Sequence, residues 1–384
     1  MRNNYSRTVR QRGATLLAVA LFSAYLVAPA LAQQSGQTTT TDAKVLDFLR
    51  RTEISGFVDV YYGYNFLTPD TRKAGPERTF DVQHNSISLN LAELSLEKKP
   101  TDDSRGGFRM DFDYGPTQDI VNATEPAGPH IFRNIGQAYL SYQAPLGKGL
   151  QIDVGKFVTP FGFEVIKTKD NWNYSRSLLF TLAIPFYHMG VRATYNVNDK
   201  VSLAGFLVNG WNNVLDNNTA KSVGGQITVK PFSALAVTET YMGGPEQPNN
   251  NHDWRHLTDT VATLTVTPKV SLAANYDYGQ DRDSGARVRW QGIAGYLKFQ
   301  PTDWFALAPR YEYFDDEHGF TSGVAQKIKE GTLTAEFKHK DGVVARLEYR
   351  HDFSDVPFFV QNTNIFRTNQ STFTVGLLYA FTTK

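Results

Sequence analysis

Residues 372–381 read TFTVGLLYAF, and this stretch alternates large apolar side chains with smaller ones. Because successive side chains of a β-strand point to opposite faces, a period of two predicts a strand with one strongly apolar face. The apolar row suits contact with lipid, and the opposite row suits a second environment. The apolar row is Phe373, Val375, Leu377, Tyr379 and Phe381, and the opposite row is Thr372, Thr374, Gly376, Leu378 and Ala380.

The same alternation recurs throughout the chain from residue 52 onward. No repeat of fixed length links the segments, which argues against a solenoid. The predicted strands are residues 54–65, 84–98, 106–115, 134–144, 149–158, 187–197, 200–211, 221–230, 234–243, 257–267, 269–280, 288–300, 303–314, 327–339, 342–353 and 369–381.

The connections between these segments are alternately short and long. Pro, Gly, Asn and Asp provide turn residues in the short connections, whereas the long ones are rich in Asn, Gly, Pro and charge. This pattern is typical of transmembrane β-barrels, which have short periplasmic turns and long extracellular loops. The short connections include residues 145–148, 198–199, 231–232, 268, 301–303 and 340–342.

We therefore expect an all-β fold, a single transmembrane antiparallel β-barrel over residues 52–384. It has about sixteen strands, with fourteen or eighteen as alternatives, and both termini lie on the periplasmic side. Closure of the sheet pairs every backbone group inside the membrane. A soluble β-sandwich of this length would usually divide into domains, so it is the weaker interpretation.

The N-terminus predicts export to the outer membrane of a Gram-negative cell. Residues 1–32 combine four arginines, a short apolar stretch and the sequence Ala30-Leu31-Ala32, as in a cleaved signal peptide. Residues 33–51 are expected to form a periplasmic tail with a short helix over residues 42–51, which lies either in the periplasm or inside the lumen. Without the four arginines, 35 of the 39 basic residues remain against 38 acidic ones, so nucleic acid is not an expected partner.

The composition agrees with a water-filled barrel. The mean hydropathy is −0.37, although 13% of the residues are aromatic. A polar lumen and polar loops explain the first value, and aromatic girdles at the membrane interfaces explain the second. No later stretch approaches the 18 consecutive apolar residues that would indicate a spanning helix.

Charges on the lipid face are costly, so the charged faces of the strands are assigned to the lumen. Eight acids against five bases predict weak cation selectivity, which basic loop residues could reverse. Lys156 is the exception, because it shares the parity of apolar neighbours and marks either a bulge or the rim. The lumen charges are Asp59, Asp111, Asp113, Asp153, Glu312, Glu336, Glu348 and Asp352 against Arg109, Arg310, Lys338, Arg346 and Arg350.

Residues 155–164 read GKFVTPFGFE, and this segment resembles one found in OmpL-like outer-membrane porins. Phosphate-selective porins carry a more distantly similar segment. Residues 54–62, 173–177 and 185–192 add to the resemblance, which implies a porin but no particular substrate. The last strand resembles the C-terminal signal that the barrel assembly machinery reads, except that three residues follow Phe381.

Residues 159–185 form the longest connection, and long loops without regular structure are usually functional. In sixteen-stranded porins the third long loop folds into the lumen, and this is the third in order. Pro160 and Gly162 would let the chain turn inward. An ordinary extracellular loop is the alternative. The expected constriction residues are Glu164, Lys167, Lys169, Asp170 and Arg176 of the loop, with Arg109, Asp111, Asp113, Arg310, Glu312, Arg346, Glu348 and Arg350 of the wall.

The sequence gives little support for catalysis, a metal or a cofactor. There is no GxSxG motif, and His252 and His256 lie in an Asn-rich stretch that favours solvated side chains. We therefore expect a non-enzymatic porin that passes small hydrophilic solutes or ions. A closed structural or adhesive barrel is the first alternative, and an outer-membrane lipase is the second. The expected partners are outer-membrane lipids, lipopolysaccharide and the barrel assembly machinery, and a homotrimer is left open.

Overall fold

The structure is a computed structural model that describes residues 40–126, 128, 130, 132–283 and 285–384. The chain divides into two units, residues 1–50 and residues 51–384. The described part of the first unit is helical and belongs to α2 (Thr40–Arg51), which begins two residues before the predicted helix. The predicted signal peptide lies outside the described residues. Among the described residues, no helix is long and apolar enough to span a membrane.

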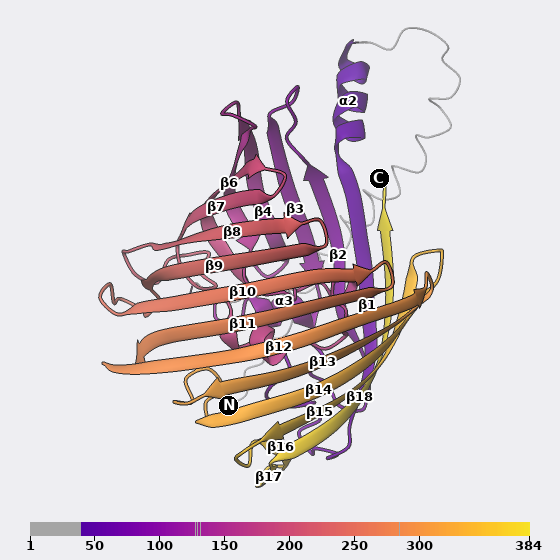
Figure 1. Cartoon of the computed structure of the whole chain (residues 1–384), viewed down its shortest axis with the longest axis vertical. Coiled ribbons are helices and arrows are strands. Elements are labelled where there is room, and N and C mark those ends of the chain that lie inside the picture. Colours follow the sequence, from indigo (N-terminus) through magenta and orange to yellow (C-terminus); the bar gives the residue numbers. More distant parts are fainter. Residues whose placement is uncertain (1–39, 127, 129, 131, 284) are drawn as a thin grey trace, which may run out of the picture. The chain divides into compact units, whose positions relative to one another are not determined.

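The second unit is a closed antiparallel barrel in which sixteen described strands follow one another around the wall (Figure 1). β1 pairs with β18, from Ser55 opposite Thr382 to Asn65 opposite Thr372, so the sheet has no free edge. The prediction of sixteen strands is confirmed, and the alternatives of fourteen and eighteen are wrong. The strands are β1 (Glu53–Asn65), β2 (Ser86–Lys98), β3 (Gly106–Tyr114), β4 (Ile135–Ala144), β5 (Leu150–Val158), β6 (Tyr187–Asn198), β7 (Val201–Val208), β8 (Ser222–Phe232), β9 (Leu235–Pro245), β10 (Trp254–Thr267), β11 (Val270–Asp283), β12 (Ala286–Thr302), β13 (Phe305–Asp316), β14 (Gln326–Lys338), β15 (Val343–Ser354) and β18 (Asn369–Thr382).

The predicted strand boundaries differ from the observed ones by at most three residues. The sequence did not predict the short elements in the long connections. These elements contain three to six residues each, which is too few for a periodic pattern. They are α3 (Pro116–Val121), the 3-10 turn η2 (Thr168–Asp170), the π-helical turn η3 (Leu179–Ala183), and the hairpin of β16 (Phe359–Asn362) and β17 (Ile365–Arg367).

The two faces of the wall differ sharply in exposure. Outward-facing Ile87 and Leu140 are 80% and 70% exposed, whereas inward-facing Asp59 and Glu312 are fully buried. Lys156 lies on the outward-facing row of β5, and the strand pairs with both of its neighbours there without a bulge. It lies near the extracellular end of β5, where its ammonium group donates to Asn122 and to the Ile135 carbonyl. The rim explanation for Lys156 therefore holds, and the bulge explanation is wrong.

The interior is less polar than the sequence suggested, because a cluster of buried apolar side chains lies inside the barrel. Loop residues and inward-facing wall residues contribute to it together. Burial of aromatic side chains removes a large apolar area from water, so this cluster fixes the loops in place. Its members include Phe80, Phe161, Leu178, Leu179, Phe180, Ala183, Ile184, Phe358 and Phe359 from the loops and Phe157, Phe206, Val208, Met242, Leu257, Trp290 and Phe314 from the wall.

Candidate pore constriction

Residues 159–186, called loop 3 here, connect β5 to β6 and enter the barrel. Gly162 has a φ of +83°, a backbone conformation that favours glycine, and it lies just after Pro160. The Phe163 amide then donates to the side chain of Asn275 on β11, at 2.9 Å. The chain therefore turns inward at the Pro-Phe-Gly sequence, where the sequence analysis expected the turn.

Three arginines of the wall donate hydrogen bonds to backbone carbonyl groups of loop 3. Arg346 donates to the carbonyls of Thr168, Asn171 and Asn173, at 2.8, 2.6 and 3.1 Å. Arg350 donates to the Arg176 carbonyl at 2.7 Å. A loop away from water needs such partners, because an unpaired buried carbonyl is costly.

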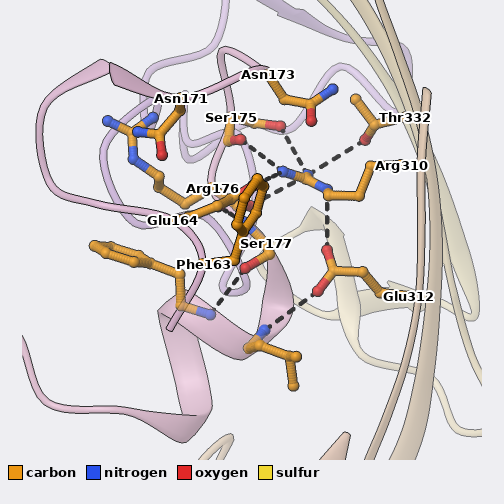
Figure 2. Close-up of polar contacts among 12 residues, drawn as sticks. Phe163, Glu164, Asn171, Asn173, Ser175, Arg176, Ser177, Arg310, Glu312 and Thr332 are labelled. Carbon is orange, nitrogen blue, oxygen red and sulfur yellow. Dashed lines mark hydrogen bonds and ion pairs between the residues drawn. The ribbon is translucent and has the colours of Figure 1, made fainter. Parts of the chain in front are cut away.

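Arg310 has the same role at Ser175, which lies between the carbonyls bound by Arg346 and by Arg350. It donates to the Ser175 carbonyl at 2.8 Å, and Figure 2 shows its guanidinium group pointing from the wall toward Ser175. It also pairs with Glu164 of the loop and with Glu312 and Glu330 of the wall, at 2.7, 3.1 and 2.8 Å. One cation is thus shared by three buried carboxylates.

Two wall carboxylates accept hydrogen bonds from the amides of the same segment. Glu348 accepts from the backbone amides of Tyr174 and Ser175 at 2.6 and 2.9 Å. Glu312 accepts from those of Leu178 and Leu179 at 3.1 and 3.3 Å. The wall therefore provides both the donors and the acceptors that a neighbouring strand would otherwise provide.

The tip of loop 3 reaches the strands at the start of the barrel. Lys167 pairs with Asp111 of β3 at 2.8 Å and also with Glu93 of β2. Asp59 of β1 accepts hydrogen bonds from the Tyr174 and Thr168 hydroxyls, at 2.8 and 2.7 Å. Because other parts of the loop contact β11 to β15, loop 3 crosses the barrel interior.

Gly376 of β18 leaves room for this crossing. A Cβ atom built at Gly376 would lie 2.3 Å from the ring of Tyr174. Gly376 belongs to the inward-facing row of residues 372–381. The small residue in that row is therefore explained by a contact with a segment some 200 positions earlier in the chain.

Loop 3 also stabilises itself. Arg176 is buried and donates to the carbonyls of Val165, Tyr174 and Ile166, at 2.9, 2.6 and 2.6 Å. The Glu164 carboxylate accepts from the Ser177 amide at 2.6 Å. These contacts place both side chains inside the fold of the loop and away from solvent.

Most of the predicted site residues are brought together, but few of them are exposed. Asp113 is also buried, next to Glu93 and Asp111 on the inner face of β2 and β3. In loop 3 the exposed charges are Lys169 and Asp170, which pair at 2.9 Å with side-chain exposures of 33% and 48%. Of the predicted wall residues, Arg109 keeps 25% exposure and pairs with Asp111.

The sequence reasoning missed four contributors to this site, two on the wall and two in the connection 66–85. Glu93 and Glu330 share the inward parity of their charged neighbours, so the same pattern could have identified them. Phe80, in the connection 66–85, packs against Phe180 and Phe186 of loop 3 with ring centroids 5.8 and 6.1 Å apart. No sequence signal indicated that this first long loop also enters the barrel.

Glu77 of the same connection is buried beside Asp352 and Arg78. Burial, followed by the charge of Asp352, raises the pKa of Glu77 to about 8. Its partner Gln370 lies on β18, so the first long loop is attached to the last strand. Among the described residues, no group of three or more His, Cys, Asp and Glu side chains could hold a metal ion.

Comparisons with known proteins agree with this architecture. The model of the family described as "Putative beta-barrel porin-2, OmpL-like" matches residues 51–381. No curated protein sequence matches the chain.

Solved outer-membrane porins share the fold at low sequence identity. The outer membrane channel DcaP of Acinetobacter baumannii has a TM-score of 0.59 and 12% identity, over 86% of this chain and 97% of that one. The anion-selective porin from Comamonas acidovorans has a TM-score of 0.59 and 10% identity, over 86% and 99%. The trimer form of OmpT from Vibrio cholerae has a TM-score of 0.57 and 11% identity, over 86% and 99%.

Proposed function

Because the chain belongs to the OmpL-like family of β-barrel porins, we propose that it forms a diffusion pore in the outer membrane. Small hydrophilic solutes or ions would pass through the barrel without a chemical step. The observation that carries this proposal is loop 3, which lies inside the barrel and is bonded to the wall on both sides. Such a loop would set the size and charge of what can pass.

The exposed inner charges favour anions over cations. All eight acids counted from the sequence are at most 3% exposed, so they are occupied with loop 3 or with wall residues. The inward-facing strand charges that keep partial exposure are mostly basic. They are Arg109, Arg192, Lys230, Arg255, Lys298 and Lys338 against Glu53, Glu97 and Asp283. When only the exposed charges are counted, the pore is expected to prefer anions, which is the reverse of the cation preference expected from the sequence.

Single-channel conductance of the purified protein in planar bilayers tests this function. We expect steady ohmic openings and, under a KCl gradient, a reversal potential of the sign for chloride. Lys169→Glu should shift that potential toward cations, because Lys169 is an exposed charge of loop 3. Lys148→Glu, in an exposed periplasmic turn, is the matched control and should leave it unchanged.

One observation favours the closed barrel as a second candidate. Aromatic side chains of loop 3 and of the connection 66–85 pack together inside the barrel, including Phe80, Phe180 and Phe186. Well-folded protein without openings in the same bilayers would support a structural or adhesive barrel and contradict the porin.

We also propose a homotrimer, as the name of the trimer form of OmpT suggests for that protein. The mass of the detergent-extracted protein, measured by light scattering, tests this assembly. A monomeric mass at micromolar protein concentration would contradict it.

A further inference from the structure

A pocket of about 440 Å³ lies at the extracellular mouth of the barrel. It is bounded by loop 3 and by the connections that follow β7, β9 and β13, and we call it the mouth pocket. Its volume falls within the range of about 300–1,000 Å³ that is usual for small-molecule sites. None of the predicted constriction residues lines it, so it is a separate feature of the molecule.

Aromatic rings form much of its wall. Trp211 and Trp290 lie edge to face with ring centroids 6.3 Å apart, and Trp290 stacks on Phe320 at 5.4 Å. Phe186 of loop 3 also lines the pocket and is half-buried, like Trp211 and Phe320. Trp290 is itself buried, and the Arg255 guanidinium lies over the rings of Trp211 and Phe320, at 4.8 and 5.3 Å from their centroids. Phe186 and the parts of Trp211 and Phe320 that stay exposed are therefore the aromatic surface offered to a ligand.

Apart from Leu182 and Ile184, the rest of the lining is polar, and both of its charged side chains have partners. Arg255 pairs with Asp281 at 2.7 Å. Glu246 accepts hydrogen bonds from the Trp211 amide and the Ser222 hydroxyl, at 2.6 and 2.5 Å. An ion that binds in this pocket would have to compete with Asp281 for Arg255 or displace the hydrogen-bond donors of Glu246. The neutral polar side chains in the lining are Thr124, Thr181, Asn212, Asn213, Asn217 and Thr321.

We propose that the mouth pocket binds a neutral saccharide of one or two rings. A sugar ring presents C–H groups on its faces, which pack on aromatic rings, and hydroxyl groups at its edge, which exchange hydrogen bonds with amides and hydroxyls. Both kinds of partner line this cavity, and a charged solute would find no free counter-charge. The inference rests on the proposed function, because it makes the pocket the first binding site for a solute that enters the pore.

The pocket is coupled to loop 3 by a direct contact. The Trp290 indole donates to the Ala183 carbonyl of loop 3 at 3.1 Å, and Thr181, Leu182, Ile184 and Phe186 of that loop line the cavity. A bound sugar would therefore rest on the end of loop 3 that contacts the apolar cluster. It should interrupt an ion current through the barrel while it is bound.

Calorimetric titration of the full mature protein with maltose and glucose tests the proposal. Gluconate serves as the charged probe, and indole serves as an aromatic probe without hydroxyl groups. We expect saturable binding of maltose or glucose, and none of gluconate. Trp211→Ala should weaken sugar binding about tenfold or more, because it removes a ring of the wall. Trp304→Phe, at an exposed position outside the pocket, is the matched control and should change nothing.

The outcomes separate the pocket from the pore. No heat with either sugar, or binding of indole alone, would overturn the saccharide site. If Trp211→Ala loses the heat-modifiable migration of folded barrels, Asn217→Ala replaces it and should weaken binding several-fold. Conductance in KCl is measured on the same preparation. A conducting protein that binds no sugar contradicts only this inference, whereas sugar binding without conductance contradicts the proposed function.

Discussion

The two halves of loop 3 are held inside the same barrel by different physics. Residues 164–177 are bonded to charged wall side chains, and Arg310, Arg346 and Glu348 occupy their backbone groups directly. Residues 178–186 are mostly apolar and pack into the aromatic cluster, and only Leu178 and Leu179 at their start still donate to the charged wall, at Glu312. Both segments must pair their buried backbone groups, but the polar segment takes these partners mainly from charged wall side chains, whereas the apolar segment is held mainly by the packing of its side chains.

This difference has a consequence for the pore. The wall charges that a sequence would assign to ion selectivity are used to hold the polar half of the loop, so they are not free to meet ions. The apolar half carries no charge, and it forms part of the mouth pocket instead. The two halves should therefore respond differently to mutation and to pH.

The largest effect is expected for Arg310→Met in the polar half. The change leaves Glu164, Glu312 and Glu330 buried without their shared cation, which typically costs about 3–5 kcal/mol. Hydrogen exchange of the amides of residues 175–179, followed by mass spectrometry, should show faster exchange than in the wild type. Lowering the pH should partly restore protection, because it protonates the carboxylates.

The control for this experiment is Lys338→Met, which removes a 40% exposed partner of Glu336. Exposed ion pairs contribute about 0–1 kcal/mol, so exchange in loop 3 should stay unchanged. Equal exchange in the Arg310 variant and the wild type would show that the polar half does not depend on this network.

A somewhat smaller effect is expected for Phe180→Ala in the apolar half. Phe180 is buried against Phe80 and Phe186, and truncation of such a ring costs about 3 kcal/mol. The same exchange measurement should show faster exchange at residues 180–186. Here the loss should not depend on pH, because no charge is left unpaired. Restoration at low pH, as in the Arg310 variant, would contradict the distinction between the two halves.

The smallest effect concerns pH at the mouth of the barrel. Burial raises the pKa of Glu246 to about 7, so the closed loops bind a proton that the opened loops would release. The stability of the closed loops should be highest below the ordinary carboxyl pKa and should fall as the pH rises through 7. The change is about 1–3 kcal/mol.

Exchange of residues 211–222 as a function of pH measures this change. Glu246→Gln should abolish the pH dependence, because the amide is neutral throughout, and Glu317→Gln at an exposed position should keep it. An unchanged pH profile in the Glu246 variant would assign the effect to another group.

Much of the architecture followed from local patterns. The alternation of side chains gave the sixteen strands to within three residues, because each strand separates two environments and a period of two records that separation. The turn at Pro160 and Gly162 was also expected, since both residues restrict or free the backbone in a known way. The order of long and short connections identified loop 3 as the segment to examine.

The sequence predicted the candidate site only in part. The alternation of side chains along the strands predicted that five charged residues face inward. It could not predict that these side chains would form hydrogen bonds with the backbone of loop 3. The five are Arg310, Glu312, Arg346, Glu348 and Arg350. Phe80 and Glu77 lie in a connection without any distinguishing pattern, and they became part of the site through contacts with distant segments. Contacts of this kind depend on how the loops fold together, which local periodicity does not record.

Residues 372–381 show both sides of this division. The sequence by itself determined a strand with its apolar row outward, because the pleat of a β-strand alternates the side chains. Only the tertiary structure decided why Gly376 interrupts the inner row, since the ring of Tyr174 occupies the space of a side chain there. Periodicity is a property of neighbours along the chain, whereas filled space inside a barrel depends on residues that meet only after folding.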